Sequence, residues 1–593
     1  MGKIKSEIFR ILRHVPVSVR RIPEKRLLII LALVVGVLCG LAAVVLKLMV
    51  DNLAHFVSGI STGKWNFIYL VLPGVGMLVS LLIVKYVIKR DVGHGVTKVL
   101  LAVSKNESKI EPRQTWASLL TSSVTIGLGG SVGAEAPIVY TGAAIGSNVA
   151  RAMNLSYKNM TILLGCGAAG AVAGIFKAPL AGVLFTLEIL LFNISMTSIL
   201  PLLLSSVSAT VVSYIFLGQE PLFPANLIPF SMGNIPFYVV LGFFCGAVSL
   251  YFTRTTLSLE DKIKNISGQY KRWALCALGL GLLIFLFPPL YGEGYSSINL
   301  LLSGSDSILD ETSVFSYLGP NPWVLLVFVT CILFFKVFAM TFTNAGGGVG
   351  GTFGPTLFIG GIAGFVMARF ANLLGFSVPE PNFVLVGMAG TMAGVMQAPL
   401  TAIFLIAEIS GGYELLIPLI LTSAISFAFS RSIEPYSIYT KRIAKRGELL
   451  THDSDQAVLT LLKLSDVIEN DFKCVKVEDT LGDLVKAVSE SSRNIFPILD
   501  SKKRFQGYVE LGDIRSKMFD RSQYGRLHVW NFLKQAPEYV YIDDHMDDVM
   551  KKFEVTGAWN LPVIGHDRKY YGFVSKSKIF SSYRKQLQQV SHD

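Results

Sequence analysis

Charged side chains are scarce in this sequence. Only 16% of the 593 residues are Asp, Glu, Lys or Arg and 52% are hydrophobic, which favours a membrane protein with room for a soluble domain. Cysteine is also scarce, with six residues and no spacing typical of a metal site, so we expect reduced thiols and no bound metal. The sequence has no nucleophile–base pair and no phosphate loop with a catalytic lysine, which argues against an enzyme and against a required cofactor.

The charges that are present gather at particular places along the chain. The net charge of +12 does not indicate a nucleic-acid partner, because basic residues commonly line the cytoplasmic edge of a membrane protein. Residues 1–26 carry eight Lys or Arg and two Glu, and they predict a cytoplasmic amphipathic segment. The apolar run Leu27–Val50 follows and predicts a first transmembrane helix.

Basic and acidic loops predict the orientation of the chain. The segments Lys85–Arg113 and Arg254–Arg272 are basic, so we expect both to be cytoplasmic. The segments Gly218–Gly233 and Tyr291–Trp323 lack Lys and Arg, so we expect both on the outside. Both termini are then cytoplasmic in a multi-pass protein of the cell membrane, plasma or inner.

One apolar region contains a carboxylate. The sequence Gly-Gly-Ser-Val-Gly-Ala-Glu-Ala-Pro at Gly129–Pro137 places Glu135 at membrane depth. Such a charge costs about 3 kcal/mol or more unless it has a partner or a wet cavity. Pro137 suits the first turn of a new helix, whose free N–H groups attract anions. We predict an anion site for which Glu135 competes; a structural Glu satisfied by helix N–H groups is the alternative.

The chain repeats itself within the membrane region. Gly167–Ile189 and Gly387–Ile409 are identical at ten of 23 positions, and both contain Ala-Pro-Leu and end in Glu-Ile. Gly133–Pro137 pairs with Gly351–Pro355 at nearly the same offset. Several apolar segments are too short to span a bilayer. These features predict two related membrane halves whose broken helices meet at a central site.

Three further stretches are candidates for this site. The loop Gly93–Val96 precedes a short helical segment, and the glycine-rich run Gly346–Pro355 offers backbone N–H groups to an anion. Ile438–Thr440 begins the final helix with a tyrosine hydroxyl. Each stretch also has a simpler interpretation. His94 could be an exposed loop histidine, Phe353 a core aromatic and Tyr439 an interfacial tyrosine.

Together, GHGV (93–96), GAEAP (133–137), GTFGP (351–355) and the late tyrosine resemble the CLC family of chloride channels and transporters. The resemblance covers about residues 27–446. It implies an α-helical polytopic membrane protein with a CLC-type inverted repeat of many tilted and broken helices. It also implies a homodimer with one separate anion pathway in each subunit.

The resemblance assigns roles within the site. Glu135 is expected to be the gate, whose carboxylate occupies the outer anion position and leaves it to let anions pass. The expected anion-binding residues are His94, Gly95, Val96, Gly133, Ala134, Thr352, Phe353 and Tyr439. Tyr436 is a second candidate for the tyrosine, because it lies only three residues earlier.

Some residues depart from the family pattern. His94 stands where a serine is usual, and Ala134 and Ala136 flank the gate in place of Arg and Gly, which puts strict chloride selectivity in question. The position of an internal proton-transfer glutamate is Ile189, directly after Glu188. Because isoleucine carries no proton, we predict a passive, gated conduction of chloride or similar anions. A chloride/proton antiporter is the alternative, since protons also travel along water chains.

The tail contains two similar units. Asp471–Phe519 and Glu538–Phe580 each predict strand, helix, strand, strand and helix, and each resembles a CBS domain. Pairs of such domains often bind adenine nucleotides such as ATP, ADP or AMP. The resemblance places Asp513 where ribose hydroxyls are held, with a plain helix N-cap as the alternative, and Lys578 replaces it in the second unit.

These features divide the chain into five parts. The predicted boundaries are residues 1–26 for the amphipathic segment, 27–446 for the transmembrane domain, 447–467 for a linker, 468–525 for the first CBS domain and 526–593 for the second.

Overall fold

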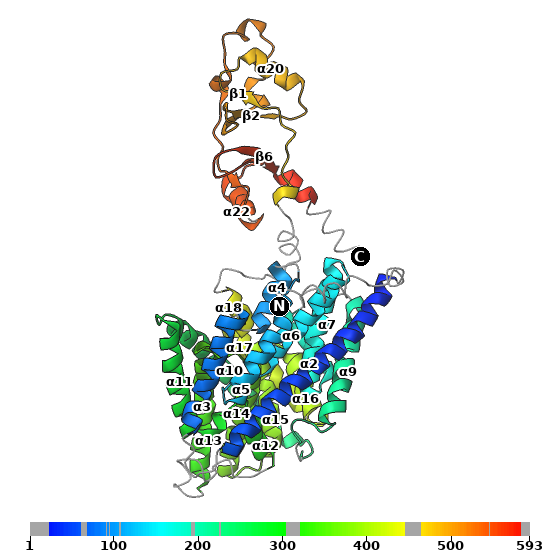
Figure 1. The fold of residues 1–593 in the computed structure, drawn as a ribbon, viewed down its shortest axis with the longest axis vertical. Helices are drawn as coiled ribbons and strands as arrows, with labels where there is room; N and C mark the ends of the chain where they lie inside the picture. The colour runs from blue at the N-terminus through cyan, green and yellow to red at the C-terminus, as the bar shows by residue number, and fades with distance from the viewer. Residues whose placement is uncertain are drawn as a thin grey trace. The chain divides into compact units, whose positions relative to one another are not determined.

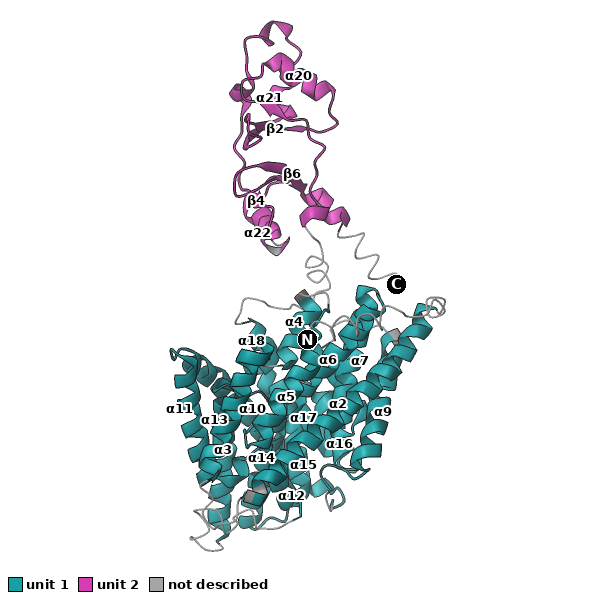
Figure 2. Cartoon of the chain, viewed as in Figure 1, with its two compact units in different colours: residues 1–450 teal, residues 451–593 magenta. Residues whose placement is uncertain are grey.

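The computed structural model describes residues 23–60, 68–90, 92–93, 95–105, 108–190, 196–224, 227–303, 321–444, 464–544 and 546–582. The chain divides into two compact units, which Figure 2 distinguishes by colour. We call residues 1–450 the membrane unit and residues 451–593 the tail unit.

The membrane unit is built of helices, and eight of its described helices are long and apolar enough to cross a membrane. The first of them, α2 (Glu24–Ile60), runs obliquely across the unit in Figure 1. It is longer than the apolar run Leu27–Val50, because the helix continues through the more polar residues that follow Val50. The prediction that the chain is a polytopic helical membrane protein is confirmed.

The helices between α2 and the first repeat, and between the repeats, frame the two halves. They are α3 (Ile68–Leu82), the π-helix η2 (Ile83–Ile88), α4 (Gly95–Lys105), α10 (Ile235–Lys264), α11 (Gln269–Leu286) and α12 (Tyr295–Leu302), with short 3₁₀ turns at Met232–Asn234 and Pro288–Leu290.

The two predicted repeats form corresponding helices. The first repeat contains α5 (Gln114–Gly127), α6 (Glu135–Ala152), α7 (Tyr157–Phe176), α8 (Pro179–Phe185), the π-helix η3 (Thr186–Leu190) and α9 (Met196–Leu217). The second contains α13 (Pro322–Ala345), α14 (Phe353–Leu373), α15 (Glu380–Met396), α16 (Pro399–Ile409) and α17 (Leu416–Ile433), and α18 (Ile438–Ala444) follows it.

Glycines allow equivalent helix pairs to pack closely in both repeats. A Cβ on Gly142 of α6 would lie 2.2 Å from the carbonyl oxygen of Gly167 in α7. A Cβ on Gly360 of α14 would lie 2.5 Å from the carbonyl oxygen of Gly387 in α15. Since both contacts are with backbone atoms, larger residues cannot be accommodated by a side-chain shift, and the Gly/Ala-rich sequences of the repeat reflect this close packing.

The predicted half-helices are present. Lys177 directly follows α7 and Gln397 directly follows α15, and both residues adopt a left-handed backbone, with φ of 58° and 54°. In each repeat a proline then starts the next, short helix, which suits the absence of a free N–H at that position. The apolar segments 179–190 and 399–409 are therefore too short to span a bilayer.

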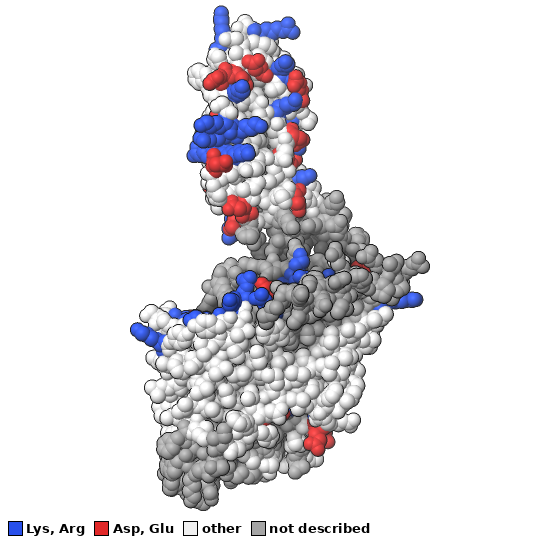
Figure 3. Space-filling model, in the orientation of Figure 1, with Lys and Arg blue, Asp and Glu red and all other residues white. Residues whose placement is uncertain are grey.

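The surface of the membrane unit agrees with burial in lipid. On the face shown in Figure 3 the described surface is largely uncharged, and Lys and Arg gather along one margin. Large apolar side chains are exposed on the outer helices, including Ile30, Val34, Val71 and Leu278. In water these side chains would be costly to expose, whereas lipid tails solvate them.

The tail unit contains two α/β modules of the same topology. In the first, β1 (Val475–Lys476) pairs parallel with β2 (Ile495–Leu499), which pairs antiparallel with β3 (Phe505–Glu510); α20 (Leu481–Ser489) and α21 (Leu511–Ile514) complete it. In the second, β4 (Val540–Tyr541), β5 (Asn560–Ile564) and β6 (Tyr570–Ser575) pair in the same way around α22 (Met546–Thr556), and residues 576–582 are helical.

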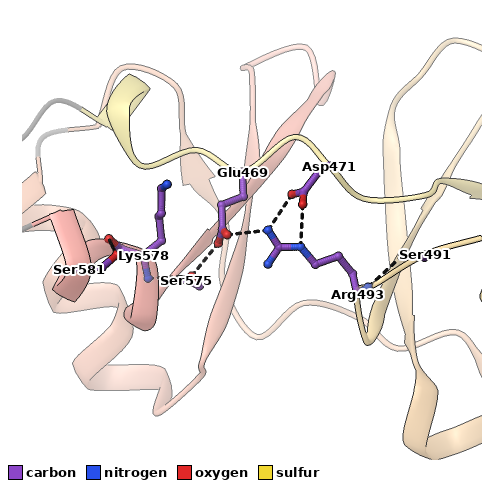
Figure 4. A network of polar contacts seen from close by, with 7 residues as sticks. All are labelled: Glu469, Asp471, Ser491, Arg493, Ser575, Lys578 and Ser581. Atoms are coloured by element: carbon purple, nitrogen blue, oxygen red, sulfur yellow. Dashed lines mark hydrogen bonds and ion pairs between the residues drawn. The ribbon is translucent and has the colours of Figure 1, made fainter.

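The segment that enters the tail unit joins its two modules. Glu469 pairs with Phe573 of β6 through two backbone hydrogen bonds of 2.8 and 3.1 Å, so residues placed in the predicted linker and first domain pack on the second module. Arg493 of the first module donates to Glu469 at 2.8 Å and to Asp471 at 2.8 and 3.0 Å (Figure 4). Ser575 donates to the other oxygen of Glu469 at 2.7 Å. This network holds the two modules together.

Candidate anion site

The two Gly-rich motifs meet at the centre of the membrane unit. Gly133 N–H donates to the Gly351 carbonyl at 3.1 Å, and Gly351 N–H donates to the Gly133 carbonyl at 2.7 Å, which forms an isolated antiparallel bridge. Helix α6 begins two residues after Gly133, and α14 begins two residues after Gly351. The bridge therefore brings together the N-termini of two equivalent helices, where free N–H groups are available to an anion.

Glu135 reaches from one of these N-termini to the other. Its side chain is buried, with 2% exposure, and it accepts the N–H of Gly354 at 3.1 Å. The hydroxyl of Tyr295 in α12 donates to the same carboxylate at 2.5 Å. Glu135 thus lies at the N-terminus of α14, in the position that a bound anion would favour.

Two glycines make room for this carboxylate. A Cβ on Gly133 would lie 2.0 Å from Oε2 of Glu135, and a Cβ on Gly354 would lie 2.8 Å from Oε1. Any other residue at either position would therefore meet the Glu135 side chain in its present place.

A second carboxylate lies beside the first. Glu293, in the turn before α12, accepts the N–H of Ala134 at 2.9 Å, directly at the start of α6. Its side chain is partly exposed, in contrast to that of Glu135. Ala134 was predicted to be an anion-binding residue, and here Glu293 accepts its N–H.

A buried cation completes this charged group. The Lys336 ammonium of α13 is fully buried, donates to the Gly292 carbonyl at 3.0 Å and lies 4.8 Å from the ring centre of Phe358. It interacts electrostatically with both Glu293 and Glu135. Glu293, Tyr295 and Lys336 were not predicted. Lys336 did carry a signal, because it is the only charged residue of the apolar helix Pro322–Ala345, and such a residue requires a partner.

Two further predicted anion-binding residues are also buried. Thr352 directly precedes α14, and Tyr439 lies in α18, with exposures of 2% each. Their hydroxyls are close together, but neither makes a well-formed hydrogen bond with a described residue. Two buried hydroxyls without an acceptor can donate to an anion. Tyr436, the other candidate, is 39% exposed, so its burial makes Tyr439 the better candidate.

Helix α18 is fixed by ion pairs that hold Tyr439 in place. Arg442 donates to Glu260 of α10 at 2.6 Å, and both side chains are buried. Lys441 pairs with Glu434, which lies seven residues earlier, directly after α17. Because an unpaired charge in this position would be costly, we expect α18 to be anchored to α10.

The remaining predicted residues have different surroundings. Phe353 is 1% exposed and packs against Phe176 and Phe185, with ring centres 5.4 and 6.1 Å away, which is also consistent with its alternative as a core aromatic. Gly95 and Val96 are buried at the start of α4, where a Cβ on Gly95 would lie 2.3 Å from the Ala136 carbonyl oxygen. His94 lies outside the described residues.

The position that the resemblance assigns to a proton-transfer glutamate is occupied by Ile189. Ile189 is buried in η3, with 6% exposure. The neighbouring Glu188 accepts the N–H groups of Leu400 and Thr401 at 3.0 and 2.7 Å, and it also accepts the Thr401 hydroxyl at 2.6 Å. Glu188 therefore caps α16, a helix of the other repeat.

Asp513, the residue placed at a nucleotide site, is engaged by a lysine. Lys534 pairs with Asp513 at 2.8 Å and with Glu510 at 3.0 Å. The hydrogen bonds to Asp513 and Glu510 raise the pKa of Lys534 to about 12, so the lysine stays charged at neutral pH. A ribose at Asp513 would have to share the carboxylate with Lys534 or displace it. Lys578, its counterpart, accepts at its carbonyl the hydroxyl of Ser581 (Figure 4).

Inverted repeats with half-helices, two equivalent helices whose N-termini meet at a central bridge, and a carboxylate on a helix N-terminus define a membrane transport protein of the anion-carrying class. The family model described as voltage gated chloride channel matches residues 75–431, and the CBS domain model matches residues 464–520. The chain therefore belongs to the CLC family and carries CBS-type modules in its tail, as the sequence predicted.

Relatives and solved structures agree with this assignment. The chain is 30% identical to "Chloride channel protein CLC-e" of Arabidopsis thaliana, over 67% of this chain and 59% of that protein. It is 26% identical to "H(+)/Cl(-) exchange transporter ClcA" of Salmonella arizonae, over 72% of this chain and 90% of that protein. A slow cyanobacterial Cl−/H+ antiporter has the same fold, with a TM-score of 0.61 at 23% identity, over 72% of this chain and 98% of the antiporter.

Proposed function

We propose that this chain exchanges chloride or a similar small anion for protons across a membrane, with Glu135 as the gate. The observation that carries the gate is the place of its carboxylate, which accepts the Gly354 N–H at the start of α14. An anion and a carboxylate compete for the same N–H groups, so the site admits an anion only when Glu135 leaves it.

The same competition supports proton coupling. Protonation removes the negative charge of Glu135 and weakens its hold on the helix N-terminus, so binding of a proton to Glu135 favours binding of an anion at the N–H groups that it leaves. The Salmonella relative named as an exchange transporter supports this choice.

A passive channel is the second candidate, and Ile189 favours it. The buried isoleucine at this position offers no carboxylate to carry a proton from the opposite side. The Arabidopsis relative is named as a channel. In an exchanger of this sequence, protons would have to reach Glu135 by another group or along water.

The inner site follows from the same proposal. We assign the inner anion position to the hydroxyls of Thr352 and Tyr439 and the outer position to N–H groups at the starts of α6 and α14. The backbone at Gly95, Val96 and Gly133 would lie close to the anion, and their side chains would take no part in binding it.

The test is to follow chloride and proton movement together in proteoliposomes containing the full chain. An imposed chloride gradient should drive protons against their own gradient, and a protonophore should abolish the proton signal. Sustained chloride flux without uphill proton movement would refute exchange and support the channel.

A substitution tests the gate itself. Glu135→Gln should raise chloride flux and abolish proton coupling, because glutamine keeps the shape but not the charge. Glu414→Gln is the matched control, since Glu414 is an exposed acid outside the site. If Glu135 is instead structural, Glu135→Gln should lower the yield of folded protein or the flux.

The assembly and orientation are part of the same proposal. We place the basic margin of the membrane unit and the tail unit in the cytoplasm, and we place the protein in the cell membrane as a homodimer with one pathway per subunit. Cross-linking in native membranes and protease protection of the tail test these statements. The tail would serve dimer stability or regulation, with an adenine nucleotide as its candidate ligand.

A further inference from the structure

We propose that Glu293 is a second gating carboxylate, which closes the N-terminus of α6 while Glu135 closes that of α14. This inference rests on the proposed gate at Glu135. The two carboxylates accept backbone N–H groups at the starts of the equivalent helices α14 and α6. Glu135 accepts the Gly354 N–H at 3.1 Å, and Glu293 accepts the Ala134 N–H at 2.9 Å.

Each carboxylate comes from an element other than the helix that it closes. Glu135 belongs to α6 and reaches α14, whereas Glu293 belongs to the turn before α12 and reaches α6. A side chain attached to a separate element can leave the helix terminus without breaking the helix that it closes. A gate requires this freedom, and a side chain that caps the helix to which it belongs does not have it.

The two positions differ in their access to water. Glu135 is 2% exposed, whereas Glu293 is partly exposed. Glu293 is therefore the more exposed of the two carboxylates, and an anion that binds the Ala134 N–H must displace it. The hydroxyl of Tyr295 donates to Glu135, so only one residue separates Glu293 from a direct partner of the other gate.

The surrounding charges permit Glu293 to move. The charged groups that act on it are Glu135, Lys47 and Asp51 of α2, and Lys336 of α13. No ion pair at salt-bridge distance ties Glu293 to a described residue. The Lys336 ammonium donates instead to the Gly292 carbonyl at 3.0 Å, next to Glu293 in the chain. Lys336 therefore keeps its own hydrogen-bond partner when either carboxylate moves away.

This arrangement predicts that removing one carboxylate opens only half of the outer site. Glu135→Gln should free the Gly354 N–H while Glu293 still closes the Ala134 N–H. Loss of one charge-assisted hydrogen bond shifts such a competition by about tenfold. We therefore expect Glu293→Gln to raise chloride flux on its own, and the double variant to exceed Glu135→Gln by about tenfold.

The experiment measures chloride efflux from proteoliposomes for the wild type, both single variants and the double variant, with Glu414→Gln as the control. Isothermal titration with bromide on the same four proteins reports how tightly the outer site binds an anion. Higher flux and tighter bromide binding in the double variant than in Glu135→Gln support the proposal. Equal values in those two proteins overturn it, because Glu293 would then be only a cap.

Glu293→Asp covers the case in which Glu293→Gln does not fold. Aspartate keeps the charge but is one methylene shorter, so it should no longer reach the Ala134 N–H and should raise flux in the same way. Wild-type flux in Glu293→Asp would overturn the proposal. Failure of the Glu135 gate has a different result, since Glu135→Gln alone would then leave flux unchanged.

Discussion

Two further carboxylates, Glu188 and Glu408, join the repeats by capping each other's half-helices. Glu188 accepts the N–H groups of Leu400 and Thr401 at the start of α16, and Glu408 accepts those of Leu180 and Ala181 at 3.0 and 2.9 Å at the start of α8. Both helices are short, with seven and eleven residues, so neither has many internal hydrogen bonds of its own. We predict that these crossed caps stabilise the membrane unit.

The expected cost of losing a cap follows from the groups left behind. Glu188→Ala removes the acceptor of two backbone N–H groups, and each unsatisfied buried donor costs about 1–3 kcal/mol. Loss of the charge at the helix N-terminus adds about 0.3–1 kcal/mol. The free energy of unfolding should fall by about 2–7 kcal/mol for Glu188→Ala. The Glu408→Ala variant should lose slightly less, since Glu408 accepts no hydroxyl equivalent to that of Thr401.

The assay is denaturant unfolding in detergent micelles, read by tryptophan fluorescence, with Glu414→Ala as the control for losing an exposed acid. The double variant should lose less than the sum of the two single variants, because both caps hold the same pair of helices. A free energy of unfolding equal to that of the control would refute the reasoning. Additive losses would show that α8 and α16 are fixed independently.

Three other changes test other parts of the molecule. Gly354→Ala should raise chloride flux at neutral pH, because its Cβ would lie 2.8 Å from Oε1 of Glu135 and displace the carboxylate. Gly412→Ala is the control, since Gly412 has open space around it. Unchanged flux in Gly354→Ala would contradict the gate. Arg493→Ala should speed hydrogen exchange at the Glu469 and Phe573 amides in the full chain, whereas the exposed Arg515→Ala should not, and equal exchange would show that Arg493 does not join the modules. ATP affinity, measured by calorimetry, should be lower in Asp513→Ala than in the wild type, and equal affinity would remove the nucleotide role. In the wild type the affinity should vary little between pH 6 and 9. The reason is that the pKa of Lys534 is raised to about 12, so its ion pair with Asp513 is lost only as the pH rises through that value.

Local sequence signals were enough to predict most of the fold. The proline of each Ala-Pro-Leu segment marks the start of a short helix, glycines precede the helices of the site, and long apolar runs mark the membrane spans. Each of these signals depends on neighbouring residues, and each occurs in both repeats. The same signals located Glu135 and Thr352 correctly at the starts of α6 and α14. Burial then distinguished Tyr439 from Tyr436, which spacing alone had left open.

The outer half of the site could not be predicted in this way. Glu293 meets Ala134 across 159 positions of sequence, and Tyr295 meets Glu135 across 160. The segment that contains both was interpreted as an outside loop because it lacks Lys and Arg. Charge counts report which side of a membrane a segment faces, but they do not report whether its end folds back into the protein.

The symmetry of the repeats separates structural carboxylates from functional ones. Glu188 and Glu408 occupy equivalent positions, and each caps a helix of the other repeat, so the pair is explained by the needs of the fold in both halves. Glu135 has no such counterpart, because the equivalent position at the start of α14 is Phe353. A symmetric fold does not require a carboxylate in only one half. The departure from symmetry at Glu135 therefore points to transport rather than stability, since a gate needs a charge that can leave its site and a cap does not.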